Sequence, residues 1–232
     1  MSVTSKGVFG AAIALLAGLA VGPASAACDD PPAAGVDWSN CDKMKLRLSG
    51  DDLSGADFSS ADLSRSDLRS AKLRGAKLVD TAMIHSSLDG ADLAGADLTK
   101  AALDRANLAG ADLTRAVLVK AELPRANLTG AKLVHADLTK AELNRAVLDD
   151  ADLTGANFTK AYLMRARLRR AKFEKANLLD ANLDLADFSG SDLSQAVGLI
   201  QTQLARACGD AATKLPPGID QPANWPCAST DD

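Results

Sequence analysis

The chain has 232 residues, a formal net charge of −4 at pH 7, 47% hydrophobic residues and 3% aromatic residues. This length is enough for a substantial core but does not indicate two ordinary domains. Only two histidines are present, His85 and His135, so a catalytic site built on paired histidines is not expected. Beyond residue 26, no apolar stretch is long enough to predict a membrane span.

Residues 1–26 are predicted to be a secretory signal peptide. Lys6 precedes the apolar stretch GVFGAAIALLAGLAVG, and Ala24-Ser25-Ala26 follows it. This is the order of a basic region, an apolar region and a cleavage site. A membrane anchor is the alternative, but the apolar stretch is shorter than the roughly 20 residues of a spanning helix. We expect cleavage after Ala26 and an exported, periplasmic or extracellular mature chain.

Four cysteines lie outside the repeated middle of the chain: Cys28, Cys41, Cys208 and Cys227. An even number in an exported chain predicts disulfides, and the sequence alone permits three pairings. We expect the two short-loop disulfides, Cys28–Cys41 and Cys208–Cys227, because the two ends should lie far apart. Zinc is not expected, since CxxC spacing and histidine partners are missing. Lipidation of Cys28 is a further alternative, although the preceding Ser-Ala-Ala is a poor lipidation sequence.

From Asp51 the chain divides without a gap into five-residue units, the last of which is SDLSQ at 191–195. The third position is leucine in 24 of these 29 units, and the first position is alanine in 24 of them. The other third positions are also large and apolar: Phe58, Met83, Phe158, Phe173 and Phe188. The second position is usually Asp, Asn, Glu or Lys. No ordinary globular domain has this pattern.

A period of five excludes both regular elements. On an α-helix, a step of five residues advances about 500°, so the leucines would drift around every face. On a flat strand, successive leucines would alternate between the two faces. A chain that turns after every fifth residue avoids both problems, because four sides close a square coil of twenty residues. Each coil then places four large and four small side chains in a narrow core.

The sustained A-(D/N)-L-x-x pattern resembles the pentapeptide repeat family over about residues 36–197. The resemblance implies an all-β fold, a right-handed quadrilateral β-helix with about twenty residues per coil. In this register Trp38, Lys43 and Leu48 take third positions, and Lys43 suggests a cap or a distorted first coil. Eight coils at a spacing of about 4.8 Å predict a rod of roughly 38 Å.

The two ends of such a rod need caps, because they would otherwise expose apolar core and unpaired backbone groups. We expect residues 27–47 to form the N-terminal cap and first coil, with Trp38 as a lid. Residues 48–197 are the expected repeat domain. Residues 198–232 are expected to form the C-terminal cap, in which LIQTQLARA at 199–207 forms a short helix and a proline-rich tail covers it.

The detailed sequence of the units recurs at multiples of twenty residues, as in LTKAALDRA at 98–106 and LTKAELNRA at 138–146. Residues with this spacing should stack on one edge, one coil above the next. The basic fifth-position residues then form two neighbouring columns, which are the candidate interaction face. The lysine column is Lys100, Lys120, Lys140 and Lys160, and the arginine column is Arg105, Arg125, Arg145 and Arg165.

Charge is distributed unevenly along the chain. The net charge is −4 over residues 28–95, +5 over 96–175 and −6 over 176–232, and the basic residues are densest in 160–175. In one interpretation, the long side chains only keep the wall soluble and prevent strand pairing. In the other, the two columns bind an anionic partner, such as an anionic envelope polymer. The sequence leaves both interpretations open and favours the first.

The search for catalytic chemistry is mostly negative. His85 and His135 are fifty residues apart, which is two and a half coils, so they should lie on opposite sides of the rod. No phosphate-binding loop or metal-ligand cluster is recognisable, and no cofactor is expected. We expect a non-enzymatic rod that acts as a structural or interaction module of the cell envelope, as a monomer or a cap-mediated dimer. The expected partner is a protein or an anionic envelope polymer, and nucleic acid is not expected. The alternatives are a DNA mimic that interacts with topoisomerases, as some pentapeptide repeat proteins do, and, more remotely, an enzyme with an unrecognised site.

Overall fold

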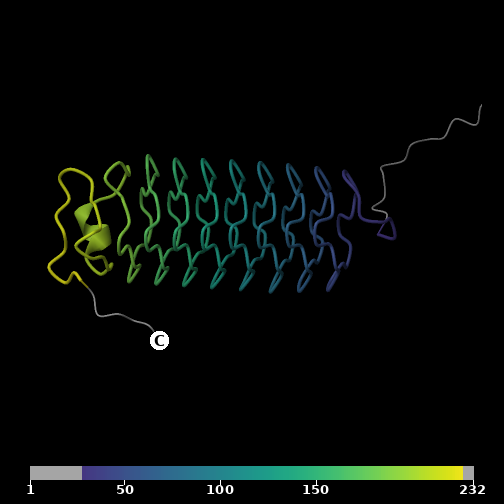
Figure 1. Cartoon of the computed structure of the whole chain (residues 1–232), viewed down its shortest axis with the longest axis horizontal. Coiled ribbons are helices and arrows are strands. Elements are labelled where there is room, and N and C mark those ends of the chain that lie inside the picture. The colour runs from purple at the N-terminus through teal and green to yellow at the C-terminus, as the bar shows by residue number, and fades with distance from the viewer. Residues whose placement is uncertain (1–27, 227–232) are drawn as a thin grey trace, which may run out of the picture.

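The computed structural model describes residues 28–226, which form an elongated solenoid (Figure 1). The coils stack along the long axis, with the N-terminal cap at one end and the C-terminal cap at the other. The predicted signal peptide and Cys227 lie outside the described residues. Within residues 28–226, no helix has the length and hydropathy of a membrane span.

Parallel β-bridges join each coil to the next. Second-position residues pair with the residue twenty positions further on, and eight such steps connect Asp37 to Val197. The N–H of Leu53 donates to the carbonyl of Lys72 over 2.8 Å, in the coil that follows. In the described part of the chain, each side contributes a single bridge residue rather than a longer strand. Because a bridge occurs every five residues and its partner is twenty residues away, each coil has four sides.

A tight turn closes every side. The N–H of Ala56 donates to the carbonyl of Leu53 over 3.1 Å, so residues 53–56 form a four-residue turn. Its third residue, Gly55, has a φ of 66°, as a type II turn requires. Lys120 occupies the equivalent position in a later coil and has a φ of 59°. The fifth position of the unit is therefore a corner of the coil, and its side chain projects outward.

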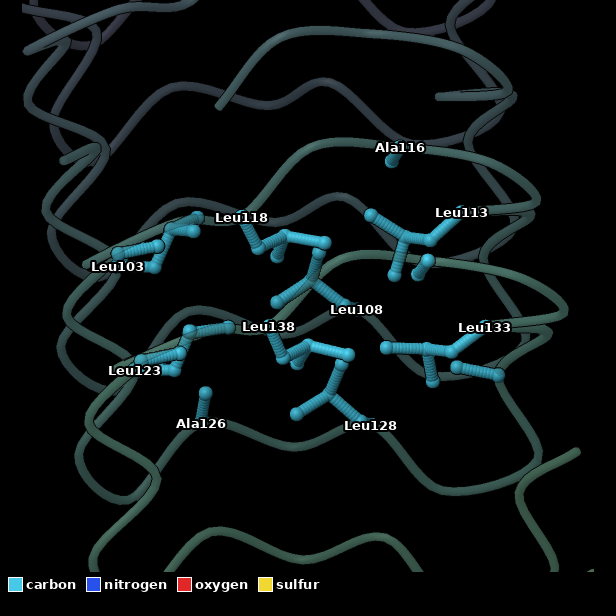
Figure 2. Close-up of a cluster of buried hydrophobic side chains, with 14 of the residues drawn as sticks. Leu103, Leu108, Leu113, Ala116, Leu118, Leu123, Ala126, Leu128, Leu133 and Leu138 are labelled. Atoms are coloured by element: carbon cyan, nitrogen blue, oxygen red, sulfur yellow. The ribbon is translucent and has the colours of Figure 1, made fainter. Parts of the chain in front are cut away.

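The third-position side chains fill the interior of the solenoid (Figure 2). Leu103, Leu108, Leu113 and Leu118 come from the four sides of one coil and are completely buried. The alanines at first positions, such as Ala116 and Ala126, lie between the large side chains and are also fully buried. Burial of each leucine contributes about 1.5–3 kcal/mol. The predicted inward third position is therefore confirmed.

The polar residues at first positions are buried without loss of hydrogen bonding. The Thr81 hydroxyl donates to the carbonyl of Phe58 over 2.7 Å, and the Ser86 hydroxyl donates to that of Met83 over 2.7 Å. Ser66 and Ser191 are also buried, and their hydroxyls donate to the carbonyls of Lys43 and Leu168. A small hydroxyl side chain can thus replace alanine because a carbonyl acceptor lies within reach, in the preceding coil for Ser66, Thr81 and Ser191 and in the preceding turn for Ser86.

The N-terminal cap is tied to the first coil by the predicted Cys28–Cys41 disulfide, which is confirmed. Trp38 is buried and packs edge-on against Phe58, with ring centroids 5.8 Å apart. Lys43 does not distort the coil, because its N–H still donates to the carbonyl of Asp62 over 2.7 Å. Its ammonium group lies 3.9 Å from the centre of the Trp38 ring and donates to the carbonyl of Cys28. A lysine is tolerated here because the open end leaves room for its charge.

The C-terminal cap continues the bridge ladder in a looser coil. Cys208 pairs with Asp187 and Lys214 with Asp192, at offsets of 21 and 22 residues instead of twenty. The helix predicted at 199–207 is shorter than expected and is a single 3₁₀ turn, η1 (Gln201–Leu204). Its shortness has a physical reason, since the N–H of Ala207 already donates to Leu204 and the next residue returns to the ladder.

Trp225 closes this end of the rod. It is buried, and its indole N–H donates to the carbonyl of Ala207 over 2.7 Å. A Cβ added at Gly209 would lie 2.3 Å from the Trp225 ring, so only glycine fits beneath it. Cys208 is disulfide-bonded, and its predicted partner Cys227 lies outside the described residues, so that pairing stays a prediction. Each of the two tryptophans of the chain thus covers one end of the core.

Candidate interaction face

The lysine and arginine columns occupy two neighbouring corners of the rod. The N–H of Lys120 donates to the carbonyl of Thr139, and that of Arg125 donates to the carbonyl of Asn144, both over 3.0 Å. These bonds join consecutive coils, so the columns run parallel to the long axis. The side between them begins after Lys120 and ends at Arg125, and the same holds one coil above and below. All eight column residues are exposed.

The side chains of the two columns are almost unneutralised. Lys100 lies 3.7 Å from Asp80, which precedes it in the lysine column. The other seven column residues form no ion pair with any residue between 28 and 226. The columns therefore present a row of free positive charges on two adjacent edges.

The arginine column is longer than four coils. Lys45, Arg65 and His85 precede Arg105 in the same register, and all three are exposed and form no ion pair with a described residue. We call the whole row the basic edge. It consists of Lys45, Arg65, His85, Arg105, Arg125, Arg145 and Arg165. The next residue in register is Leu185, which ends it.

Another side of the rod, by contrast, neutralises its own charges. Its second-position row alternates acidic and basic residues for most of its length, from Asp52 through Lys72 to Asp192 and Lys214. Lys72 pairs with Asp52 over 3.5 Å, and Lys214 pairs with Asp192 over 2.8 Å. The sequence reasoning missed this ladder. The signal was available, because Asp and Lys alternate at the second position when the chain is read in steps of twenty.

The densest basic segment, 160–175, is not the most positive surface. Arg169 pairs with Asp187 and Arg170 pairs with Asp150, each over 2.6 Å, and Arg167 also pairs with Asp149. Asp149 is only 5% exposed, so this last carboxylate is buried against its arginine. Within this segment the charges that stay unneutralised belong to Lys160 and Arg165, one in each column.

Two carboxylates stand between the columns. Glu122 and Glu142 occupy second positions on the side that the columns bound, and both are exposed. Neither forms an ion pair with a described residue. Tyr162 continues their row towards the C-terminal cap and is 48% exposed. The face as a whole therefore has positive edges and a partly negative centre.

A family model described as Pentapeptide repeats matches overlapping stretches that together cover residues 52–197. The chain belongs to the pentapeptide repeat family. Membership implies the right-handed quadrilateral β-helix, and the twenty-residue ladder and five-residue turns agree with it. No curated protein matches the chain.

Solved pentapeptide repeat proteins are similar to the chain. One is HetL of the cyanobacterium Nostoc, described as involved in heterocyst differentiation regulation; it is 32% identical, with 77% of this chain and 87% of HetL covered and a TM-score of 0.48. A protein from the Arabidopsis thaliana thylakoid lumen is 30% identical. The match covers 53% of this chain and 68% of that protein, with a TM-score of 0.20. QnrB1, a plasmid-mediated fluoroquinolone resistance protein, is 18% identical, with coverages of 77% and 90% and a TM-score of 0.33.

The described part of this pentapeptide repeat protein brings no catalytic group together. His85 and His135 lie on corners half a coil apart in register, and the His135 ring lies over Gly155. Residues 28–226 contain no group of three or more metal-ligating side chains. A shallow hollow of about 210 Å³ lies between the last two coils and includes Lys172, Glu174 and Asp192. The Lys214 ammonium, followed by the hydroxyl and N–H of Ser194, holds the pKa of Asp192 at about 2, which is too low for a general base near neutral pH.

The low pKa of Asp192 predicts a dependence of stability on pH. Because the folded pKa lies below the unfolded value of about 3.9, the paired carboxylate stabilises the repeat above about pH 4, and this contribution is lost as the pH falls through about 2. The Asp192 side chain is 45% exposed, so screening limits the effect to about 0.5–1 kcal/mol. Thermal unfolding should show Asp192→Asn less stable than the natural chain at pH 6 and equal to it near pH 2. A difference in unfolding temperature between the variant and the natural chain that stays constant with pH would contradict this.

Proposed function

We propose that this pentapeptide repeat protein is an exported, non-enzymatic rod that works by surface contact in the cell envelope, and that its lysine and arginine columns bind an anionic partner. The proposed location rests on the signal-peptide pattern of residues 1–26. The Cys28–Cys41 disulfide supports it, because such bonds persist mainly in oxidising compartments. The family as a whole consists of interaction and structural modules, which agrees with a surface role.

The observation that carries the proposal is the lack of neutralisation in the two columns. Elsewhere on the described rod, most arginines and lysines, such as Arg170 and Lys214, have a carboxylate partner, although Arg47, Arg115 and Lys132 do not. In the columns, consecutive charges are one coil apart, at about 4.8 Å, and two like charges at about 5 Å repel by about 0.8 kcal/mol even in water. An anion that lies against a column relieves this repulsion, and salt screens it.

The DNA-mimic alternative is not favoured by the described surface. Mimicry of DNA requires a continuous acidic face, whereas the basic edge runs from Lys45 to Arg165 without an acidic residue. The expected net charge of the mature chain is mildly negative, but much of that acidity is neutralised in pairs such as Asp192–Lys214. An enzyme is likewise not proposed, because the hydroxyl–carboxylate contacts of the described residues, such as Ser194–Asp192, are turn hydrogen bonds that recur along the repeat, and neither histidine joins one.

Binding is tested with the mature chain, residues 27–232, and purified anionic envelope polymer in a sedimentation assay. We expect binding at low salt that weakens steeply as salt rises. Replacement of Lys120, Arg125, Lys140 and Arg145 by glutamine should abolish most of it. The matched control replaces four basic residues outside the columns, Arg47, Arg115, Lys132 and Lys175, and should bind nearly normally. Binding that does not depend on salt concentration, or equal loss of binding in both variants, would refute the proposal.

Cell fractionation with mass spectrometry of the N-terminus tests export: a cytosolic chain that retains Met1 would refute the proposed location.

A further inference from the structure

We propose that the partner is a linear, carboxylate-bearing polysaccharide, a polyuronate in chemical class, which lies lengthwise along the basic edge rather than between the two columns. This inference rests on the proposed function and deepens it, since it assigns both the path of the partner and its chemistry. Three features of the rod carry it: the length of the basic edge, the asymmetry of its two flanks, and the kinds of side chain found there.

The basic edge is a straight row without an acidic interruption. Its seven residues come from seven consecutive coils, so it is about 29 Å long at one coil per about 4.8 Å. The lysine column is shorter and is bracketed by acids, because Asp80 precedes it and pairs with Lys100, and Asp180 follows it. A small anion would need only one or two of these charges. A row of this length along the rod matches an extended polymer with regularly spaced charges.

The two flanks of the basic edge differ in charge. On the side towards the lysine column, the exposed Glu122 and Glu142 stand between the columns and repel an anion placed there. On the opposite flank, the second-position row is neutral through the middle coils, at Asn107, Asn127 and Val147. Towards the ends of the basic edge the same row carries Asp67, which pairs with Arg69, and Arg167, which pairs with Asp149. A polyanion therefore meets the least repulsion if it contacts the arginines from this neutral flank.

Two of the three acids on the sides that form the neutral flank are paired with arginines. Asp149 is buried against Arg167 and Asp67 pairs with Arg69 over 2.6 Å, whereas Asp89 accepts a hydrogen bond from the neutral Asn107 amide over 3.4 Å and keeps its charge. The corner beyond them is formed by Gly110 and Gly130, where a Cβ would meet no atom within 4 Å, so the surface there is low and open. The flank thus offers a polymer a flat path beside the arginine side chains.

The side chains favour a carboxylate polysaccharide over a nucleic acid. The planar guanidinium fork of arginine matches a carboxylate through two parallel hydrogen bonds. Single-stranded nucleic acids need aromatic side chains on which bases stack, but the outward positions of the neutral flank carry no aromatic side chain, and its middle coils present Asn127, Thr129 and Val147. Tyr162, the single tyrosine of the chain, lies on the other flank. In a polyuronate each sugar ring carries one carboxylate, and a ring advances the polymer by a distance similar to one coil.

The test uses oligogalacturonates of two to twelve sugars and the mature natural chain, with affinity measured by calorimetry at low salt. We expect affinity to rise with length until about seven sugars, one for each coil of the basic edge, and then to level off. Replacement of Arg105, Arg125 and Arg145 by glutamine should lower affinity at least tenfold and reduce the salt slope by about 2. The charge-matched comparison, with glutamine at Lys120, Lys140 and Lys160, should lose clearly less affinity than the arginine variant, because these lysines add only to the electrostatic field around the polymer. Both variants should keep the thermal stability of the natural chain.

Each contrary result has a distinct meaning. Equal losses in the two triple variants would overturn the assigned path, because the polymer would then contact both columns. An affinity that does not depend on length would overturn the lengthwise arrangement. If polyphosphate or oligothymidylate of equal charge binds as tightly as the oligogalacturonate, the polyuronate class is wrong, although the proposed anion-binding function stands. If none of these polyanions binds, the inference fails, and the assay with whole envelope polymer decides separately whether the proposed function fails with it.

Discussion

Replacement of Leu138 by lysine is expected to lower the free energy of unfolding by about 5 kcal/mol, because the leucine packing is lost and an unpaired charge enters a dry core. Leu138 is completely buried and stacks against Leu118 of the preceding coil (Figure 2). Each coil contacts only its neighbours, so the damage should divide the solenoid near its middle. Chemical denaturation followed by circular dichroism measures the loss.

The outward position Asn144 provides the matched control. It is a half-buried fourth-position residue on the next side of the same coil, and Asn144→Lys should change the free energy of unfolding by less than about 0.5 kcal/mol. Leu138→Ala should fall between the two, at about 2–5 kcal/mol, since it leaves a cavity but adds no charge. Equal stability of the lysine variant and the natural chain would contradict the inward orientation of the third position.

Removal of the Cys28–Cys41 disulfide has the second-largest expected effect. The bond closes a loop with a sequence separation of 13 residues, for which the loss of chain entropy predicts about 3 kcal/mol. It also holds the segment that covers Trp38, whose indole N–H donates to the carbonyl of Asp30 over 3.1 Å. In a Cys28→Ser, Cys41→Ser variant, the first coil should open and Trp38 should become exposed to water.

Tryptophan fluorescence reports this opening if Trp225 is first replaced by phenylalanine, so that Trp38 is the single tryptophan. We expect a red shift on removal of the disulfide, together with a lower unfolding temperature. Serine at position 41 should not itself cause the change, since Ser66 and Ser86 occupy equivalent buried first positions with their hydroxyls hydrogen-bonded. An unshifted spectrum and an unchanged unfolding temperature would show that the disulfide does not hold the cap.

The caps show where prediction from the sequence lost detail. Lys43 stands at a third position and suggested a distorted coil, yet the backbone ladder passes through it without change. The local sequence does not show that the rod is open beyond Lys43. Nor does it show that Trp38 and the Cys28 carbonyl lie close enough to contact the Lys43 ammonium group. At the other end, apolar spacing predicted a helix over 199–207, but the return of Cys208 to the ladder limits it to the turn η1.

The sequence predicted where the two columns of the candidate interaction face lie, but not which basic residues of the rod are neutralised by carboxylates. The spacing of twenty residues is enough to place Lys120 above Lys100 and Arg125 above Arg105. Whether a charge is neutralised depends on carboxylates 18 to 22 residues away, as in Arg167–Asp149 and Lys214–Asp192. A pair forms only where the basic and acidic side chains of neighbouring coils lean towards each other. The densest basic segment, 160–175, therefore proved largely neutral, while the more widely spaced columns remained charged.

The sequence by itself determined the coil, because a large apolar residue at every fifth position, with alanine two residues earlier, can be buried continuously only in a chain that turns after every unit. It also determined the register, since the units recur every twenty residues, which is the length of one coil. Only the tertiary structure decided which charges remain free and how the ends close. These outcomes depend on contacts between neighbouring coils and on the two tryptophans that cover the core, and such contacts exist only after the coils have stacked.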